Sequence, residues 1–125
     1  MKLLRGILIG ALLWVLIFVE WSLIIFTPIL KDLGNYQYII HFLVLIPIVI
    51  FGANYYYKSK DKVNGFLLGA VMLITGMVLD AIITVPLFTI PQGVNHMAFF
   101  FNPLMLLGFV EFILITGIYW VKKVR

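Results

Sequence analysis

The sequence predicts an all-α integral membrane protein with four transmembrane helices in one bundle. Composition is the first reason: 64% of the 125 residues are hydrophobic and only 11% are charged, which leaves too little polar surface for a soluble domain. The second reason is that the apolar residues form four runs of about 20 residues, the length that a helix needs to cross a bilayer. The segments between these runs are short, so residues 1–125 are expected to form a single domain.

Proline and asparagine residues indicate where these runs begin and end. The four spans are predicted over residues 6–26, 38–56, 65–87 and 103–121. Pro28 disfavours helix in the residue before it and closes the first span, whereas Pro47 is expected to kink the second. Asn64 can cap the third span, which is bent or ended by Pro86. Pro103 suits the first turn of the fourth span.

Basic residues gather on one side of the predicted membrane. The chain has nine Lys and Arg residues, and in this threading only Lys31 lies on the side opposite the two termini. Basic flanks are retained on the cytoplasmic side of a membrane. We therefore expect both termini to be cytoplasmic, and we interpret the net charge of +4 as a topology signal rather than as a nucleic-acid-binding surface.

The two halves of the chain resemble each other. The first span carries a Gly-x-x-x-Gly pair at residues 6 and 10 before Glu20, and the third carries the same pair at residues 65 and 69 before Asp80. Both hairpins run in the same direction, so the pattern suggests a parallel 2+2 repeat.

The connection from Thr89 to Asn102 is unusually apolar for a loop, with no Lys, Arg, Asp or Glu. Such a segment is expected to lie in the membrane interface. The alternative is that it folds as a lid over the mouth of the bundle.

Each predicted span contains one ionisable side chain: Glu20, His41, Asp80 and Glu111. At a rise of 1.5 Å per residue, these four lie about 5–12 Å from the same end of the bundle. Ionisable groups at this depth are costly and mark ion pathways or polar contacts between helices. The agreement in depth predicts that the four side chains form one polar pocket, whereas the simpler interpretation is hydrogen bonding between helices.

Small and hydroxyl residues support an inward orientation of these side chains. Gly76 lies one turn from Asp80, and Gly108 lies one turn from Glu111. Small residues mark helix faces that approach a neighbour closely. Thr84 is expected either to satisfy backbone groups freed by the following proline or to orient Asp80.

Three functions are compatible with an acidic pocket inside the membrane. The first is binding or transport of a proton, a cation or a small cationic solute. The second is an accessory or assembly subunit of a larger membrane complex, in which the acids pair with a partner. The third is an intramembrane hydrolase with a carboxylate dyad. Nucleotide-binding and hydrolase motifs are missing, which favours a non-enzymatic function. We therefore assign no catalytic residues.

The sequence also bounds the cofactors and partners. Cysteine is absent, which excludes thiol chemistry and Cys-ligated metals. Three carboxylates and one imidazole could ligate a divalent metal, but no spacing signature supports a metal site, and we expect no cofactor. The expected partners are the lipid bilayer and either a second copy of the chain or a larger membrane complex.

One stretch of the third span resembles a known family. The string from Leu79 to Phe88 (LDAIITVPLF) is similar to that of a family of small bacterial membrane proteins of unknown function. The chain length, the four-span layout and the glycine-rich first span with Trp14 are similar as well. The resemblance implies a bacterial plasma membrane and adds weight to Asp80, but it implies no activity.

Overall fold

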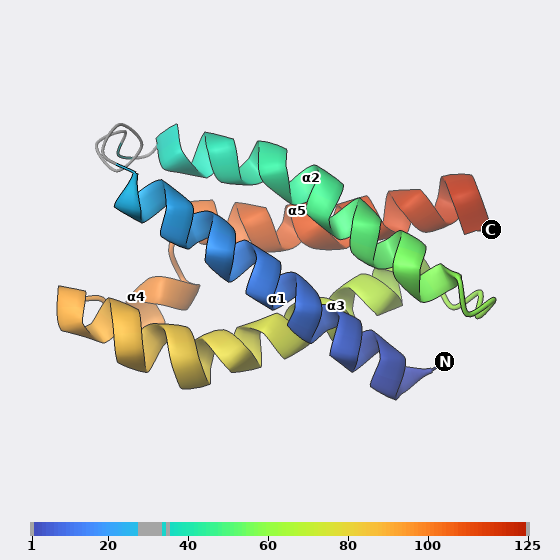
Figure 1. Ribbon diagram of the computed structural model, residues 1–125, viewed down its shortest axis with the longest axis horizontal. Coiled ribbons are helices and arrows are strands. Elements are labelled where there is room, and N and C mark those ends of the chain that lie inside the picture. The colour runs from blue at the N-terminus through green and yellow to red at the C-terminus, as the bar shows by residue number, and fades with distance from the viewer. Residues whose placement is uncertain (1, 28–33, 35, 125) are drawn as a thin grey trace.

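The computed structural model describes residues 2–27, 34 and 36–124 (Figure 1). Pro28 and Lys31, which entered the predictions above, lie outside the described residues. The regular elements are α1 (Leu3–Phe26), α2 (Tyr36–Tyr57), α3 (Gly65–Leu79), the π-helix η2 (Asp80–Thr89), the 3-10 turn η3 (Ile90–Gln92), α4 (His96–Phe100), α5 (Pro103–Tyr119) and the π-helical η4 (Trp120–Val124). The predicted all-helical class is confirmed for this part of the chain.

Four helical segments are long and apolar enough to cross a membrane. They are Leu3–Phe26, Tyr36–Tyr57, Gly65–Thr89 and Pro103–Val124. Helix α2 continues through Pro47. The third span does not end at Pro86, because helical structure continues through this residue in the π-helix η2. Proline is tolerated there because other donors can satisfy the carbonyl that it leaves without a partner.

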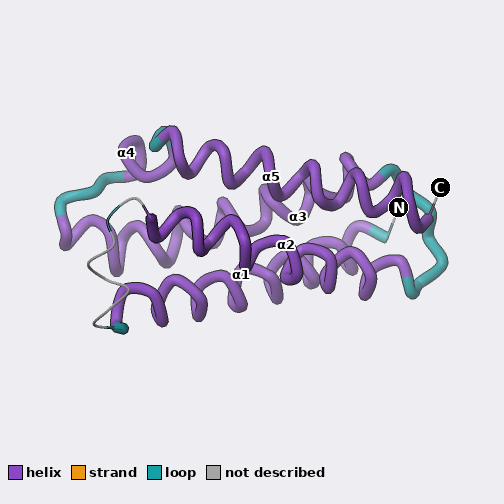
Figure 2. Tube along the Cα trace, turned by 90° about the horizontal axis from the view of Figure 1, so that it is seen from above, coloured by secondary structure: helices purple, strands orange, loops and turns teal. Residues whose placement is uncertain are grey.

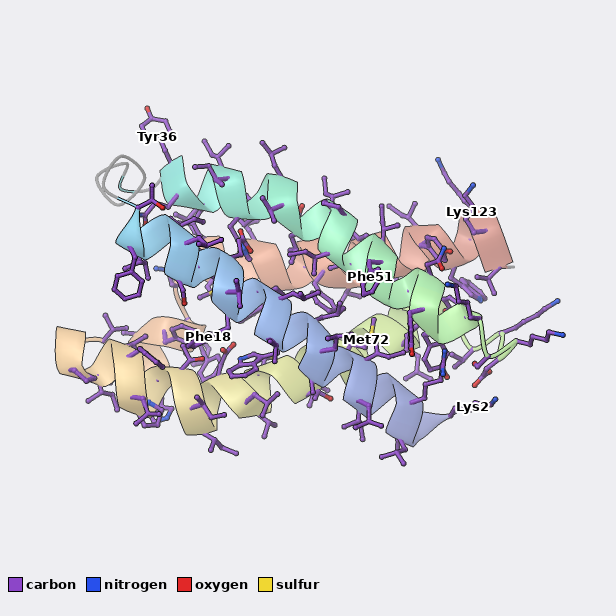
Figure 3. All side chains as sticks on the ribbon, viewed as in Figure 1. Lys2, Phe18, Tyr36, Phe51, Met72 and Lys123 are labelled. Atoms are coloured by element: carbon purple, nitrogen blue, oxygen red, sulfur yellow. The ribbon has the colours of Figure 1, made fainter. Side chains whose placement is uncertain are left out.

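The four long segments run side by side, with both chain ends at the same end of the bundle (Figures 1 and 2). Helix α3 packs against α1 and α5, and α2 packs against the same two helices. Each long helix therefore has two main neighbours. We refer to the two ends of the bundle as the terminal end, where Lys2 and Lys123 lie (Figure 3), and the α4 end.

Glycines permit the closest helix contacts, toward the terminal end. A Cβ added to Gly10 of α1 would lie 2.9 Å from the Met72 Cα of α3. A Cβ added to Gly69 of α3 would lie 3.1 Å from the Ile113 Cα of α5. From the crossing at Gly10, α1 and the α3–η2 segment diverge toward the α4 end (Figure 1). The divergence opens space in that half of the bundle.

The N-terminus is fastened to the loop between α2 and α3. The Lys2 backbone N–H donates to Asp61 Oδ2 at 2.9 Å, and the Tyr56 hydroxyl donates to the same oxygen at 2.8 Å. The Val63 N–H donates to Asp61 Oδ1 at 3.1 Å. Hydrogen bonds to a carboxylate favour its charged form, so the Tyr56 hydroxyl and then the Lys2 N–H lower the pKa of Asp61.

Candidate functional site

A cavity of about 390 Å³ lies between the diverging helices. It begins near the α1–α3 crossing, where Gly10 and Met72 line it, and extends to α4, where Ala98 and Phe99 line it. Most of its wall is apolar, and its Phe, Trp and Tyr members are Trp14, Phe18, Trp21, Phe26, Tyr38, Phe88, Phe99, Phe109 and Phe112. Phe18 lies between α1 and η2 (Figure 3), with its ring centroid 5.1 Å from that of Phe88. The cavity is therefore a mostly apolar, aromatic space inside the bundle.

Asp80 supplies a carboxylate to this wall, at the junction of α3 and η2. The Trp14 indole Nε1–H donates to Asp80 Oδ1 at 2.8 Å, and the Thr84 hydroxyl donates to the same oxygen at 2.8 Å. These two bonds fix the carboxylate and offset part of its desolvation cost. Two roles were expected for Thr84, and its hydroxyl group has the second one, because it orients Asp80. Gly76, one turn before Asp80, also lines the cavity.

Trp14 is a site residue that the sequence reasoning did not single out for this role. A helical face could have indicated it, because Gly10, Trp14, Ile17 and Trp21 follow steps of four and three residues and all line the cavity. Glu20 occupies an adjacent face of the same helix and does not line the cavity.

The π-helix explains how α4 is held against η2. In a π-helix each N–H bonds the carbonyl five residues earlier, as the Ile90 N–H does with the Val85 carbonyl. Pro86 has no N–H, so this pattern leaves the Ala81 carbonyl without its helical donor. His96 Nε2 lies 2.9 Å from that carbonyl oxygen. Because a carbonyl only accepts, Nε2 carries the proton, and His96 supplies the donor that Pro86 lacks.

Glu20 and His41 form a buried pair between α1 and α2. His41 Nδ1 lies 3.1 Å from Glu20 Oε1 and 3.0 Å from Oε2, and the two residues are only 5% and 8% exposed. His41 belongs to the cavity wall and Glu20 does not, so the imidazole is the member of the pair that a ligand would meet. Nε2 is turned toward α5, 3.7 Å from the position of a Cβ on Gly108.

Glu111 lies on α5, one turn after Gly108. Its Oε1 is buried and has no hydrogen-bond partner among the described residues. The charge of Glu111 interacts with those of His41 and Glu20, but Glu111 does not line the cavity. An unsatisfied buried carboxylate oxygen is costly, so this side chain is suited to hold a proton or to meet a donor from outside the bundle.

Of the four ionisable residues, Asp80 and His41 line the cavity, whereas Glu20 and Glu111 do not. Asp80 lies with Trp14 and Thr84, whereas Glu20 and His41 pair with each other near Glu111. Helix rotation separates them, because Glu20 and Trp14 occupy different faces of α1. Within the described residues, no group of three or more His, Asp or Glu side chains is arranged to hold a metal ion.

A family match covers most of the chain. Residues 29–124 match a family described as a family of unknown function (DUF5367). The matched segment contains His41, Asp80 and Glu111, whereas Trp14 and Glu20 precede it. No curated protein and no solved structure matches the chain. The predicted resemblance to an uncharacterised family is confirmed, and the chain belongs to the family of unknown function DUF5367.

Proposed function

We propose that this multi-pass membrane protein binds a small organic cation in its aromatic cavity, as a binding protein or as one step of transport. Asp80 would provide the countercharge. The observation that carries the proposal is a fixed carboxylate in the wall of a mostly apolar cavity inside a membrane-spanning bundle. We further propose that the protein resides in a plasma membrane with both termini cytoplasmic, as the distribution of basic residues predicts.

The hydrogen-bond partners of Asp80 support a cationic ligand. Trp14 and Thr84 both donate to Oδ1, but neither carries a charge. A carboxylate inside a membrane is costly unless a positive group balances it. A cation bound in the cavity would provide that balance, whereas an anionic ligand would be repelled.

The rest of the wall favours a ligand with an apolar body. A volume of about 390 Å³ lies within the usual range of small-molecule sites, roughly 300–1,000 Å³. Trp14 and Trp21 both line the cavity, and tryptophan offers the most favourable ring face for a cation. Together these features suit an amine or quaternary ammonium that carries an aromatic or aliphatic group.

The other two functions have less support. A hydrolase with a carboxylate dyad needs two carboxyl groups that can reach one substrate, whereas Glu20 and Glu111 do not line the cavity that Asp80 lines. One observation favours an accessory subunit: the buried Glu111 Oε1 has no hydrogen-bond partner within the described chain. A donor from a second copy or another membrane protein could satisfy it.

Thermal unfolding of the purified protein in detergent would test the cation site. The probe is benzyltrimethylammonium, and its uncharged control is neopentylbenzene, which has the same shape. A ligand that binds only the native state stabilises it, by about 2.7 kcal/mol at a hundred times its Kd. We expect stabilisation by the cation in wild type, none by the neutral compound, and none in Asp80→Asn.

The matched control variant is Asp61→Asn, which removes a carboxylate at the terminal end of the bundle. It should keep the full cation-induced shift, measured relative to its own unfolding temperature without the cation. Equal shifts by the cation and the neutral compound would refute a charge-selective site. A cation-induced shift retained in Asp80→Asn would show that Asp80 is not the countercharge.

A further inference from the structure

The cation cavity has a second ionisable group in its wall, the His41 imidazole. We propose that the Glu20–His41 pair is a proton site linked to the cation site, so that binding of one cation releases one proton. This inference rests on the proposed function of the cavity. It adds that the cavity releases a proton when the cation binds.

The geometry gives the two nitrogens of His41 different surroundings. Nδ1 lies against both oxygens of Glu20, at 3.0 and 3.1 Å. Nε2 is turned toward Gly108 of α5, which lines the same cavity as His41. A proton on Nδ1 is held by the carboxylate in either state of the ring. The second proton, on Nε2, is therefore the one that can leave.

Burial makes the protonated pair the favoured state of the empty cavity. With a neutral imidazole the pair carries one negative charge, and with an imidazolium it carries none. Both side chains are at least nine-tenths buried, and an uncompensated charge in a membrane interior is costly. The pair should therefore hold the second proton when no cation is present.

A bound cation reverses this preference. It would share the cavity with the imidazolium, and like charges repel strongly where the effective dielectric constant is low. Loss of the Nε2 proton removes this repulsion. The exchange also conserves charge: Asp80, Glu20 and an imidazolium sum to minus one, and so do Asp80, Glu20, a neutral imidazole and one cation.

Charged and titratable groups from several helices surround His41. Glu20 faces it from α1, Glu111 interacts with its charge from α5, and Asp80 shares the cavity from the α3–η2 junction. Tyr38, one turn earlier on α2, also lines the cavity. The carboxylates among these neighbours attract a positive charge on the imidazole, whereas a cation in the cavity would repel it.

Calorimetry measures the released proton directly. Benzyltrimethylammonium is the probe, because its charge is permanent and it has no proton of its own to lose. Titrations near neutral pH in buffers with different ionisation enthalpies give the number of protons released per cation bound. We expect about one proton for wild type and none for His41→Gln. Below the titration midpoint, wild-type affinity should rise about tenfold per pH unit.

The possible outcomes separate the two proposals. Binding to wild type with no proton release and no pH dependence would overturn the proton linkage and leave the cation site standing. Absence of binding at every pH would overturn both proposals. Proton release that persists in His41→Gln would place the proton elsewhere. If His41→Gln does not fold, Glu20→Gln serves in its place, since loss of the carboxylate should abolish most of the release, and retained release would contradict the assignment.

Discussion

The two ends of this bundle use the same helices in opposite ways. Toward the terminal end, glycines bring backbones into contact, as Gly10 does against Met72, and the interior is filled by side chains such as Leu13, Val49 and Leu68, which are fully buried. Toward the α4 end the helices diverge around an aromatic cavity. The comparison indicates that the tight helix packing and the cavity lie at different ends of one bundle.

Side-chain size accounts for the difference. Helix α1 crosses α3 at Gly10, where a side chain would collide with backbone. One turn later it carries Trp14, and two turns after that Trp21. Small residues allow close packing of membrane helices, whereas large rings hold them apart. A change from glycine to tryptophan along one helix face therefore converts a tight crossing into a cavity.

The largest effect is expected from filling the tight crossing. In Gly10→Ala the new Cβ would lie 2.9 Å from the Met72 Cα, so backbone must move. Overpacking of this kind lowers the free energy of unfolding by about 1–3 kcal/mol. Thermal or denaturant unfolding in detergent would measure the loss.

Gly76→Ala is the matched control at the cavity. Its Cβ would have its nearest neighbour at 4.0 Å, the Cδ1 of Trp14. We expect a change within about 0.5 kcal/mol. Equal losses in the two variants would contradict the division of the bundle into a tight end and an open end.

The next effect concerns the Trp14 indole. Trp14→Phe keeps an aromatic ring in the cavity wall but removes one of the two donors to Asp80 Oδ1. Removing a partner from a buried polar group destabilises a protein by about 1–3 kcal/mol, and part of this loss should disappear in Asp80→Asn. A double-mutant cycle measures the coupling. Trp21→Phe, at the same cavity beside His41, should not couple to Asp80.

A smaller effect is expected at His96, whose imidazole N–H takes the place of the backbone N–H that Pro86 lacks. His96→Ala leaves the Ala81 carbonyl without the imidazole N–H, which should lower the free energy of unfolding by about 1 kcal/mol. Pro86→Ala restores a backbone N–H, so the loss caused by His96→Ala should shrink in that background. Unfolding of both single variants and the double variant gives the coupling energy. Additive losses would mean that the imidazole does not substitute for the missing N–H.

The sequence predicted the spans and the ionisable residues more readily than their arrangement. Continuous apolar runs are unmistakable, and Glu20, His41, Asp80 and Glu111 stand out because charge is rare within them. Whether these residues share a pocket depends on the rotation of each helix. A face through Glu20 and a face through Trp14 have the same helical spacing, so periodicity alone cannot distinguish them.

The bond between His96 and Ala81 was beyond sequence reasoning for a different reason. Pro86 is visible in the sequence, but the carbonyl that it leaves without a donor depends on the helix type. An α-helix would leave that of Ile82, whereas the π-helix leaves that of Ala81. The sequence placed His96 only in an apolar connection, and the role of this residue follows from the π-helix.

The smallest effect is expected at the terminal end, where stability should depend on pH through Asp61. Hydrogen bonds from Tyr56 and Lys2 lower the pKa of Asp61 from its ordinary value of 3.8. A group with a lowered folded-state pKa contributes stability that is present above its ordinary pKa and is lost as the pH falls through the lowered value. Wild type should therefore lose stability below about pH 4, relative to Asp61→Asn, while the two keep a constant difference between pH 5 and 7. Because this carboxylate is exposed, water screens much of its interaction energy, and the change should be smaller than that of any variant above. If the free energies of unfolding of wild type and Asp61→Asn change in parallel down to pH 3, the contact between Asp61 and the N-terminal segment contributes nothing to stability. The stability of the terminal end would then come from its glycine crossings and its buried core.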